Sequence, residues 1–166
     1  LRDRKSLLNH LSSGSIAKVI VTAPANDIPN VVFGINHKDS FESSEQLFST
    51  ASCTTNAIVP VLQVLESRYG VVKAHIETIH AYTNDLNLVD NMHTKARRGR
   101  AGALNMVITE TGAGGAVSKI LPKLKNKITA NAIRVPIPNG SLAILVVELN
   151  KKTSISDVTK NLWLYH

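Results

Sequence analysis

The sequence predicts an α/β protein. Short runs of β-branched residues alternate along the chain with longer stretches whose apolar residues recur at helical spacing. The composition, with 43% hydrophobic and 19% charged residues, is that of a globular domain with one core. The longest apolar runs, such as 142–147, are far too short to cross a bilayer. Composition therefore argues against disordered and membrane-spanning classes.

Charge and cysteine content narrow the possible partners and compartment. The formal net charge of +7 favours anionic partners, either a phosphorylated metabolite or a nucleic acid. A single cysteine excludes an internal disulfide and most cysteine-based metal sites, so no metal is expected and a reducing compartment fits best. No basic-then-apolar signal opens the sequence. We therefore expect a cytoplasmic location.

The first third of the chain is expected to hold two strands between helical segments. Residues 1–17 have the pattern of the end of a helix closed by serines and a glycine. The β-branched runs 18–23 and 31–36 predict two strands joined by a proline-containing loop. Because both runs are apolar throughout, they suggest a sheet covered on both faces. The polar stretch 37–50 predicts a loop and a short helix.

The middle of the chain predicts a helix, a long strand and a long loop. Apolar residues at helical spacing follow Cys53, and Gly70 is a natural end for this helix. The run 71–83 alternates as a long strand does. Residues 84–103 lack an apolar period and carry a basic cluster, so an irregular loop is expected. Loops of this length in compact domains are usually functional.

The last third predicts three more strands and two helices. Pro122 should end the first of these helices, and Ser154 should cap the second. The expected elements are, in order, a strand at 104–108, a turn at 109–112, a helix at 113–121, strands at 128–135 and 142–149, and a helix at 154–163.

The stretch 51–56, Ala-Ser-Cys-Thr-Thr-Asn, is where chemistry is expected. It places Cys53 among hydroxyl and amide side chains that favour turns and helix caps. At a helix N-terminus, free N–H groups and the helix dipole favour the nucleophilic thiolate over the thiol. The alternative, a small buried hydrophobe, is the common role of a lone cysteine. The polar neighbours favour the reactive thiol.

His80 is the candidate partner of the thiol. It lies near the end of the predicted strand 71–83, 27 positions after Cys53, where the two side chains could meet across a sheet edge. A thiolate beside an imidazole is an activated nucleophile. His37, His75 and His93 are also within range, and for His75 and His93 ordinary packing is the simpler interpretation.

Several ordered motifs together carry a family resemblance. The segments SCTTNAIVPVL, TIHAYTND, ARRGRAGALN, TETGAGGAVSKILP and AIRVPIPNGSLAI resemble phosphorylating glyceraldehyde-3-phosphate dehydrogenase over roughly residues 17–150. The resemblance implies a partial α+β catalytic domain over 53–166, a mixed sheet with helices on one face. Residues 1–52 would be the last strands of an incomplete Rossmann, dinucleotide-binding domain.

The resemblance also implies an oxidation with NAD or NADP as cofactor. Cys53 would attack glyceraldehyde 3-phosphate to form a thiohemiacetal, and after hydride transfer the resulting thioester would be cleaved by inorganic phosphate to an acyl phosphate. His80 would be the general base, and the Cys53 N–H a donor to the developing oxyanion. Thr22 would contact the cofactor.

Two anion sites should flank the thiol. The residues that match the inorganic-phosphate site are Ser52, Thr54, Thr111 and Gly112, and those that match the site for the substrate's own phosphate are Thr83 and Arg134. Hydroxyls and free N–H groups would converge on an anion where Thr111 opens a helix, and Arg134 would add charge-assisted hydrogen bonds. Without the resemblance, Thr111 reads as a helix cap and Arg134 as part of a strand-end ion pair.

The basic loop 84–103 has three interpretations. A charge run is usually a solvated face. In the family this loop packs between subunits of a homotetramer, which would make Arg97, Arg98 and Arg100 interface residues. Nucleic-acid binding is disfavoured because no aromatic residues are interleaved with the basic ones.

The sequence departs from the family pattern in several places. No Gly-x-Gly-x-x-Gly follows a strand, and the final residues do not resemble the family's continuation. Gly140 stands where a β-branched residue is usual and Leu86 where Gln is frequent. We therefore expect these 166 residues alone to lack NAD-dependent activity. The alternatives are an erythrose-4-phosphate dehydrogenase, which shares the Cys and His, and a non-catalytic truncated remnant with an interaction role.

Overall fold

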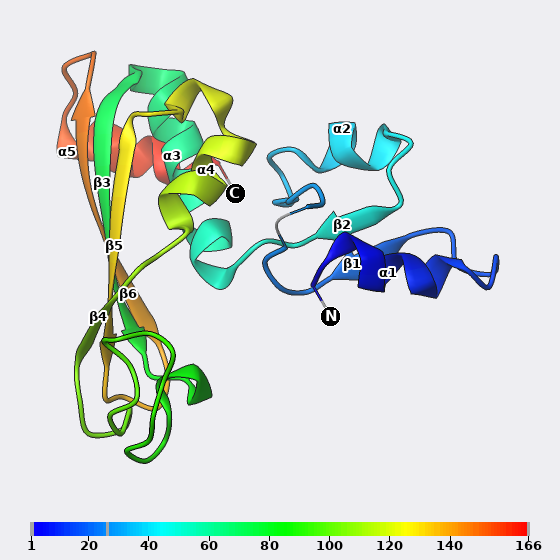
Figure 1. Cartoon of the computed structure of the whole chain (residues 1–166). Coiled ribbons are helices and arrows are strands. Elements are labelled where there is room, and N and C mark those ends of the chain that lie inside the picture. Colours follow the sequence, from blue (N-terminus) through cyan, green and yellow to red (C-terminus); the bar gives the residue numbers. More distant parts are fainter. Residues whose placement is uncertain (1, 26, 166) are drawn as a thin grey trace.

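The computed structural model describes residues 2–25 and 27–165. They form two parts that lie side by side, a smaller one up to residue 52 and a larger one from residue 53 onward (Figure 1). The larger part is built on a four-stranded sheet and the smaller part on a two-stranded one. The chain passes once between them, just before Cys53.

The smaller part contains two short helices and two short strands. Their bounds are α1 (Arg4–Leu11), β1 (Val19–Val21), α2 (His37–Glu42) and β2 (Leu47–Ser49). β1 and β2 pair in parallel. The Asp3 carboxylate caps α1 by accepting a hydrogen bond from the N–H of Ser6. The helix end expected within residues 1–17 is confirmed.

A small core and a polar contact hold this part together. The buried apolar residues of its core are Leu7, Ala25, Ile28 and Leu47. The Arg4 guanidinium donates to both oxygens of Glu45, at 2.8 and 3.2 Å, and joins α1 to the start of β2. These hydrogen bonds are the largest cause of the lowering of the pKa of Glu45 from 4.5 to about 2. The carboxylate is therefore charged in the folded protein.

The prediction of a strand at 31–36 is wrong. This segment forms turns, in which Gly34 has a φ of +82° and the Asn36 side chain accepts from the N–H of Val32. The glycine and the asparagine break the extended backbone that the apolar residues suggested. The partner of β1 is instead β2, which lies inside the polar stretch 37–50. The small sheet is also not covered on both faces, since Ile20 is 52% exposed.

The helix and strand that follow Cys53 are confirmed. α3 (Cys53–Tyr69) ends at Gly70, whose φ of +72° turns the chain directly into β3 (Val71–Ala81). The Glu66 carboxylate accepts from the N–H of Val71 and fixes this turn. Because α3 and β3 run in opposite directions, the start of the helix lies near the end of the strand.

The long loop is irregular, as expected, apart from one short helical turn, η1 (Asn84–Leu86). The side chain of Leu86, the last residue of this turn, is buried, and Arg98 forms an ion pair with Asp85. Arg100 lies 3.3 Å from Asp90. The strand after the loop, β4 (Val107–Thr109), begins three residues later than the sequence suggested.

The remaining elements agree with the sequence to within one or two residues. They are α4 (Ala113–Ile120), β5 (Ile128–Val135), β6 (Ser141–Leu149) and α5 (Ile155–Trp163). A short helical turn that the sequence did not predict, η2 (Pro122–Leu124), follows α4. Ser154 caps α5, as expected, by accepting from the N–H of Asp157.

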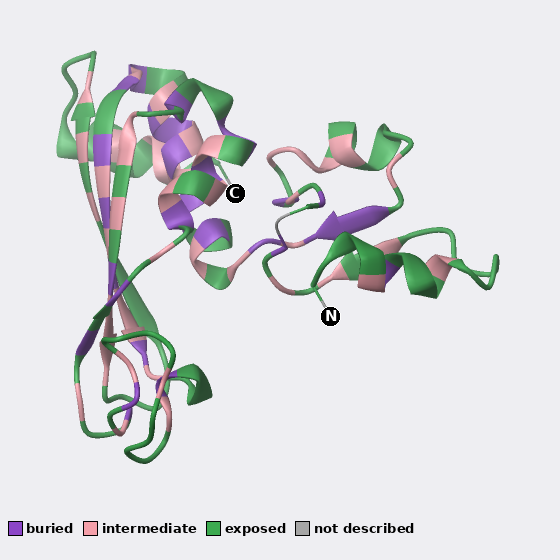
Figure 2. Ribbon diagram, viewed as in Figure 1, coloured by how far each residue is buried: buried purple, intermediate pink, exposed green. Residues whose placement is uncertain are grey.

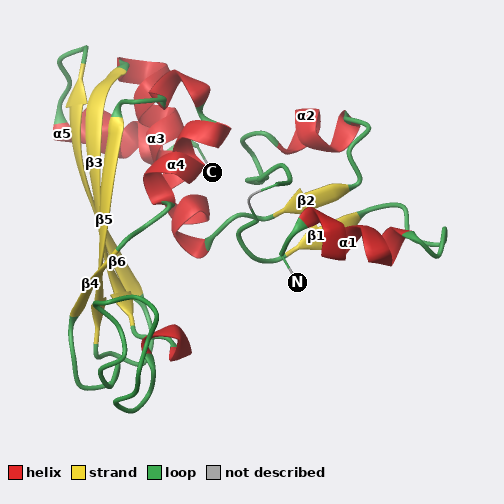
Figure 3. Ribbon diagram, viewed as in Figure 1, coloured by secondary structure: helices red, strands yellow, loops and turns green. Residues whose placement is uncertain are grey.

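The large sheet is mixed and has helices on one face, which confirms the predicted fold class. Its strand order is β4-β5-β3-β6, with β3 and β5 parallel and the other neighbours antiparallel (Figure 3). Helices α3 and α4 contact this sheet and each other, and the buried core lies between them and the strands (Figure 2). On the other face, Leu142, Ile144 and Val146 of β6 are exposed.

None of the described helices is long and apolar enough to cross a membrane. Within the same residues, no group of three or more histidine, cysteine, aspartate or glutamate side chains is placed to hold a metal ion.

Candidate active site

Cys53 is the first residue of α3. The Ser52 hydroxyl caps the helix by accepting from the N–H of Thr55 at 3.1 Å. Ala51 has a left-handed φ of +57°, which a non-glycine residue adopts at an energetic cost. This turn brings the chain sharply from β2 into the helix. The thiol is therefore exposed at a helix N-terminus, as the sequence predicted.

Side-chain hydrogen bonds hold the turn before the thiol. The Ser49 hydroxyl accepts from the N–H of Ala51 and donates to the carbonyl of Ala23. The Asn56 amide donates to the carbonyls of Thr50 and Ser52, at 2.7 and 2.9 Å. These contacts bind the strained turn to both parts of the molecule and fix the position of Cys53.

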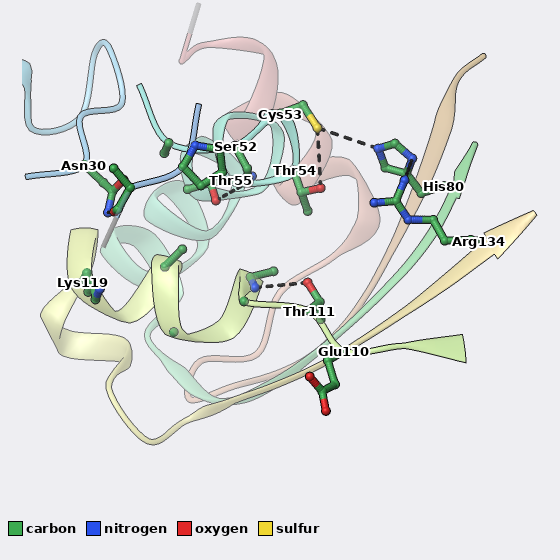
Figure 4. Close-up of a pocket in the computed structure, with 17 residues that line it drawn as sticks. Asn30, Ser52, Cys53, Thr54, Thr55, His80, Glu110, Thr111, Lys119 and Arg134 are labelled. Atoms are coloured by element: carbon green, nitrogen blue, oxygen red, sulfur yellow. Dashed lines mark hydrogen bonds between the residues drawn. The ribbon is translucent and has the colours of Figure 1, made fainter. Parts of the chain in front are cut away.

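The structure brings Cys53 and His80 together. Cys53 Sγ lies 3.8 Å from His80 Nε2 and 4.0 Å from Thr54 Oγ1, and Figure 4 shows the imidazole facing the sulfur. His37, His75 and His93 do not line the pocket that surrounds the thiol. His75 instead contacts the Thr129 hydroxyl at 2.8 Å. The thiol–imidazole pairing is the arrangement of an activated nucleophile.

Arg134 holds the other side of the imidazole. Parallel pairing places it directly beside His80, on β5. Its Nη1 donates to the Ala81 carbonyl at 2.9 Å and lies 2.8 Å from His80 Nδ1. Nδ1 is also 2.8 Å from that carbonyl. Nδ1 cannot accept from Arg134 and carry a proton at the same time. In the tautomer with the proton on Nδ1, this nitrogen donates to the Ala81 carbonyl, and Nε2 is free to take the thiol proton.

The surroundings of Arg134 favour a bound anion. Burial lowers the pKa of this guanidinium from its usual value, and the charge of Arg98 lowers it further, whereas Cys53 raises it. A partly desolvated cation next to a second cation gains from a nearby negative charge.

A pocket of about 410 Å³ surrounds these groups, where the two parts of the molecule meet. The predicted site residues that line it are Ser52, Cys53, Thr54, His80, Thr111, Gly112 and Arg134. Two do not: Thr83 is an exposed residue before η1, and Thr22 is an exposed residue after β1.

Thr111 and Gly112 open α4 on one wall of the pocket. The Thr111 hydroxyl accepts from the N–H of Ala113 at 3.2 Å, so it begins the helix as the sequence suggested. No side chain caps α4 at Gly112, and a Cβ at this glycine would meet nothing within 4 Å. The wall is therefore open to a ligand at a helix N-terminus.

Sequence reasoning missed several residues of the lining, among them Asn30, Glu110 and Lys119. The position of Lys119 could have been predicted from its spacing. It stands three positions after Ala116 and four after Gly115, so the three residues share one face of α4, and all three line the pocket. Asn30 carried none, since its position depends on how the smaller part folds.

Comparison with known proteins shows the family of this chain. The family model described as "Glyceraldehyde 3-phosphate dehydrogenase, C-terminal domain" matches residues 52–163. The chain belongs to the glyceraldehyde-3-phosphate dehydrogenase family. A glyceraldehyde-3-phosphate dehydrogenase-like protein of Pseudomonas aeruginosa is 51% identical over 97% of this chain. The glyceraldehyde-3-phosphate dehydrogenases of Mycobacterium leprae and of the maize chloroplast are 46% and 45% identical, over 90% and 95% of it.

The chain covers only part of these glyceraldehyde-3-phosphate dehydrogenases, between 35% and 44% of their lengths. The matched C-terminal domain includes every predicted site residue except Thr22. The residues of this chain do not fit a whole dinucleotide, because no glycine-rich turn follows β1 or β2 to hold a pyrophosphate. Within the family, this chain thus carries the thiol together with His80 and Arg134.

Proposed function

We propose that the chain supplies the acyl-transfer site of an NAD(P)-dependent, phosphorylating glyceraldehyde-3-phosphate dehydrogenase. The observation that carries this proposal is the 3.8 Å approach of Cys53 Sγ to His80 Nε2 at a helix N-terminus, beside Arg134. Membership of the family supports it.

The first step is attack on the aldehyde. His80 Nε2 takes the thiol proton, and the Cys53 sulfur forms a bond to the carbonyl carbon of glyceraldehyde 3-phosphate. The N–H groups at the start of α3 stabilise the resulting oxyanion. The same imidazole can give this proton to the oxyanion or remove it again from the hydroxyl. One side chain therefore serves as both general acid and general base.

Oxidation of the thiohemiacetal needs NAD or NADP as the hydride acceptor. The described residues lack the cradle for its pyrophosphate, so that step is not assigned to them. We propose that residues 1–52 belong to the dinucleotide-binding domain, with Thr22 beside the cofactor. Residues 53–166 belong to the catalytic domain.

The second step assigned to this chain is phosphorolysis of the thioester. A phosphate oxygen attacks the acyl carbon, the carbon–sulfur bond breaks, and the thiolate leaves as the acyl phosphate forms. The groups proposed to hold the phosphate are Ser52, Thr54, Thr111 and Gly112. Arg134, with Thr83 at the edge of the site, is proposed to bind the phosphate that the substrate already carries.

Assembly and location belong to the same proposal. A homotetramer in the cytoplasm would place the loop 84–103 between subunits, where Arg97 has no ion-pair partner among the described residues of its own chain. Neither membrane nor nucleic-acid binding forms part of this proposal.

Acyl transfer can be tested without a cofactor, because phosphorolysis is reversible. The purified chain is incubated with acetyl phosphate, and the acetyl thioester on Cys53 is detected by mass spectrometry. Added radiolabelled phosphate should then appear in acetyl phosphate. We expect Cys53→Ser to abolish exchange and His80→Gln to slow it by about a hundredfold or more.

The matched control is His75→Gln, which removes a histidine from the same strand but outside the pocket. Exchange at the wild-type rate is expected for this variant. If the folded chain forms no thioester with acetyl phosphate, the non-catalytic alternative is supported instead.

A further inference from the structure

The reactive pocket extends well beyond the thiol. Cys53, His80 and Arg134 lie at one end, whereas Asn30 and Lys119 lie on the side away from the sulfur (Figure 4). Ser52, Thr55 and the start of α4 lie between these two ends. The roles proposed above use the first end and the middle and leave the second end without a function.

Small residues keep the path between the two ends open. Gly112, Gly115 and Ala116 form the side of α4 that lines the pocket, and Lys119 follows them one turn later. A Cβ at Gly112 or at Gly115 would meet nothing within 4 Å. The residues that line the pocket between Thr111 and Lys119 therefore have no side chain larger than a methyl group.

The two side chains at the far end can bind an anion. Lys119 is exposed and has no ion-pair partner among the described residues. Asn30 is partly buried, and among the described residues its amide donates one long hydrogen bond, 3.4 Å to the Ala25 carbonyl, so a second N–H remains for a ligand. A cation and an amide donor on facing elements suit a phosphate oxygen.

The charged residues near the thiol leave a use for a second cation in binding phosphate. Arg134 already contacts His80 and the Ala81 carbonyl, and in the proposed reaction it binds the phosphate of the substrate. Glu110, the one acidic residue of the lining, stands next to Thr111 and repels an incoming phosphate. Its carboxylate points away from the sulfur in Figure 4. Lys119, in the last turn of α4, places a positive charge farther along the pocket.

We propose that Lys119 and Asn30 form a further anion position at the far end of the pocket, which captures inorganic phosphate before it moves to Thr111 and Ser52. The proposal that an anion binds here depends only on the pocket and its lining residues. Its use as an acyl acceptor rests on the function proposed above.

The test compares an anionic with a neutral reagent at the same thiol. Iodoacetate and iodoacetamide both alkylate Cys53, and only iodoacetate is drawn by positive charge. Lys119→Gln is expected to lower the iodoacetate rate about threefold and to leave the iodoacetamide rate unchanged, because one charge near the path contributes a modest attraction in water. In about 1 M salt the difference should disappear.

Lys123→Gln is the matched control, since it removes the same charge from η2, outside this pocket. It should leave both rates unchanged, and Lys119→Arg should restore the iodoacetate rate. Inorganic phosphate should protect the wild-type thiol from iodoacetate at lower concentrations than it protects Lys119→Gln or Asn30→Ala.

If Lys119→Gln slows alkylation by both reagents equally, Lys119 has a structural role and the proposal is overturned. The proposal is also overturned if Lys123→Gln slows alkylation by iodoacetate as much as Lys119→Gln does. The alkylation test is independent of thioester formation. A chain that steers iodoacetate through Lys119 but forms no acetyl thioester would keep the anion position and refute the proposed function.

Discussion

The two parts of the molecule are stabilised in different ways. The larger part buries a continuous cluster between α3, α4 and its sheet, with Val59, Leu62 and Ile76 fully covered. From the smaller part, Val32 also belongs to this cluster. The smaller part buries few apolar side chains and depends on polar contacts such as Arg4–Glu45. Burial of apolar surface is the dominant stabilising contribution, so the larger part should be the more stable one.

The reactive pocket lies where the two parts meet, but they contribute to it unequally. Cys53, His80 and Arg134 all come from the larger part, from α3, β3 and β5. The smaller part adds Pro24, Ala25, Asn30 and Ser52, together with the turn at Ala51. The groups that need accurate alignment are thus on the better-packed scaffold, and the less stable part forms one wall.

The largest expected effect comes from cavities made in each of the two cores in turn. Leu62→Ala should lower the free energy of unfolding of the sheet by about 2–5 kcal/mol, because it leaves a cavity in the main cluster. Leu47→Ala makes the same change in the smaller core. Hydrogen exchange should then rise in residues 19–49 while β3 and β5 stay protected. Equal loss of protection in both parts would contradict the distinction.

A second effect tests the junction of α3 and β3. Gly70→Ala should cost about 1–2 kcal/mol, because the positive φ disfavours an L side chain. Its new Cβ would also lie 2.9 Å from Asn150 Nδ2, which must move away. Urea denaturation followed by circular dichroism measures the loss. Gly14→Ala has a similar φ but open space in the smaller part, so it should leave the unfolding of the large sheet unchanged.

A smaller effect concerns the helix that presents the thiol. Ser52→Ala removes the cap of α3 and should lower stability by about 1 kcal/mol. Ser154→Ala makes the matching change at α5. Both should shift the urea midpoint, but only Ser52→Ala should slow alkylation of Cys53. A similar slowing by Ser154→Ala would mean that overall stability, and not the cap, controls the thiol.

The smallest effect is the response of the smaller part to acid. The pKa of Glu45 falls from 4.5 to about 2 on folding, so its contribution is present above about pH 4.5 and is lost as the pH falls toward 2. For this partly exposed pair we expect at most about 1 kcal/mol. Amide chemical shifts of β2 should report the loss, and Glu45→Gln should remove this pH dependence. An unchanged profile in that variant would show that Arg4–Glu45 contributes nothing.

The larger part was predictable from the sequence because its signals are local and consistent. The period of α3 ends at a glycine, and the capped start of α5 and the runs of β5 and β6 stand at their expected positions. The smaller part was less predictable. The apolar run at 31–36 has strand composition, yet Gly34 and the Asn36 side chain make it a turn. That outcome depends on side-chain hydrogen bonds that composition does not reveal.

The candidate site shows the same contrast. Cys53 and His80 were identifiable from residue types and spacing, and the family pattern added Arg134. Thr83 and Thr22 fall outside the pocket lining of this chain, and their roles stay predictions. The positions of Asn30 and Glu110 follow from how segments distant in sequence fold together. Gly140, which departs from the family pattern, has a φ of +92° in the turn between β5 and β6.

The pairing of β3 with β5 has a consequence for how the protein is made. His80 and Arg134 are neighbours in the sheet but lie 54 positions apart along the chain. Contacts between distant positions form slowly, because the long intervening loop must close first. During synthesis the thiol leaves the ribosome well before Arg134 does. A nascent chain therefore carries Cys53 without its complete charged surroundings until β5 has been translated and has paired with β3.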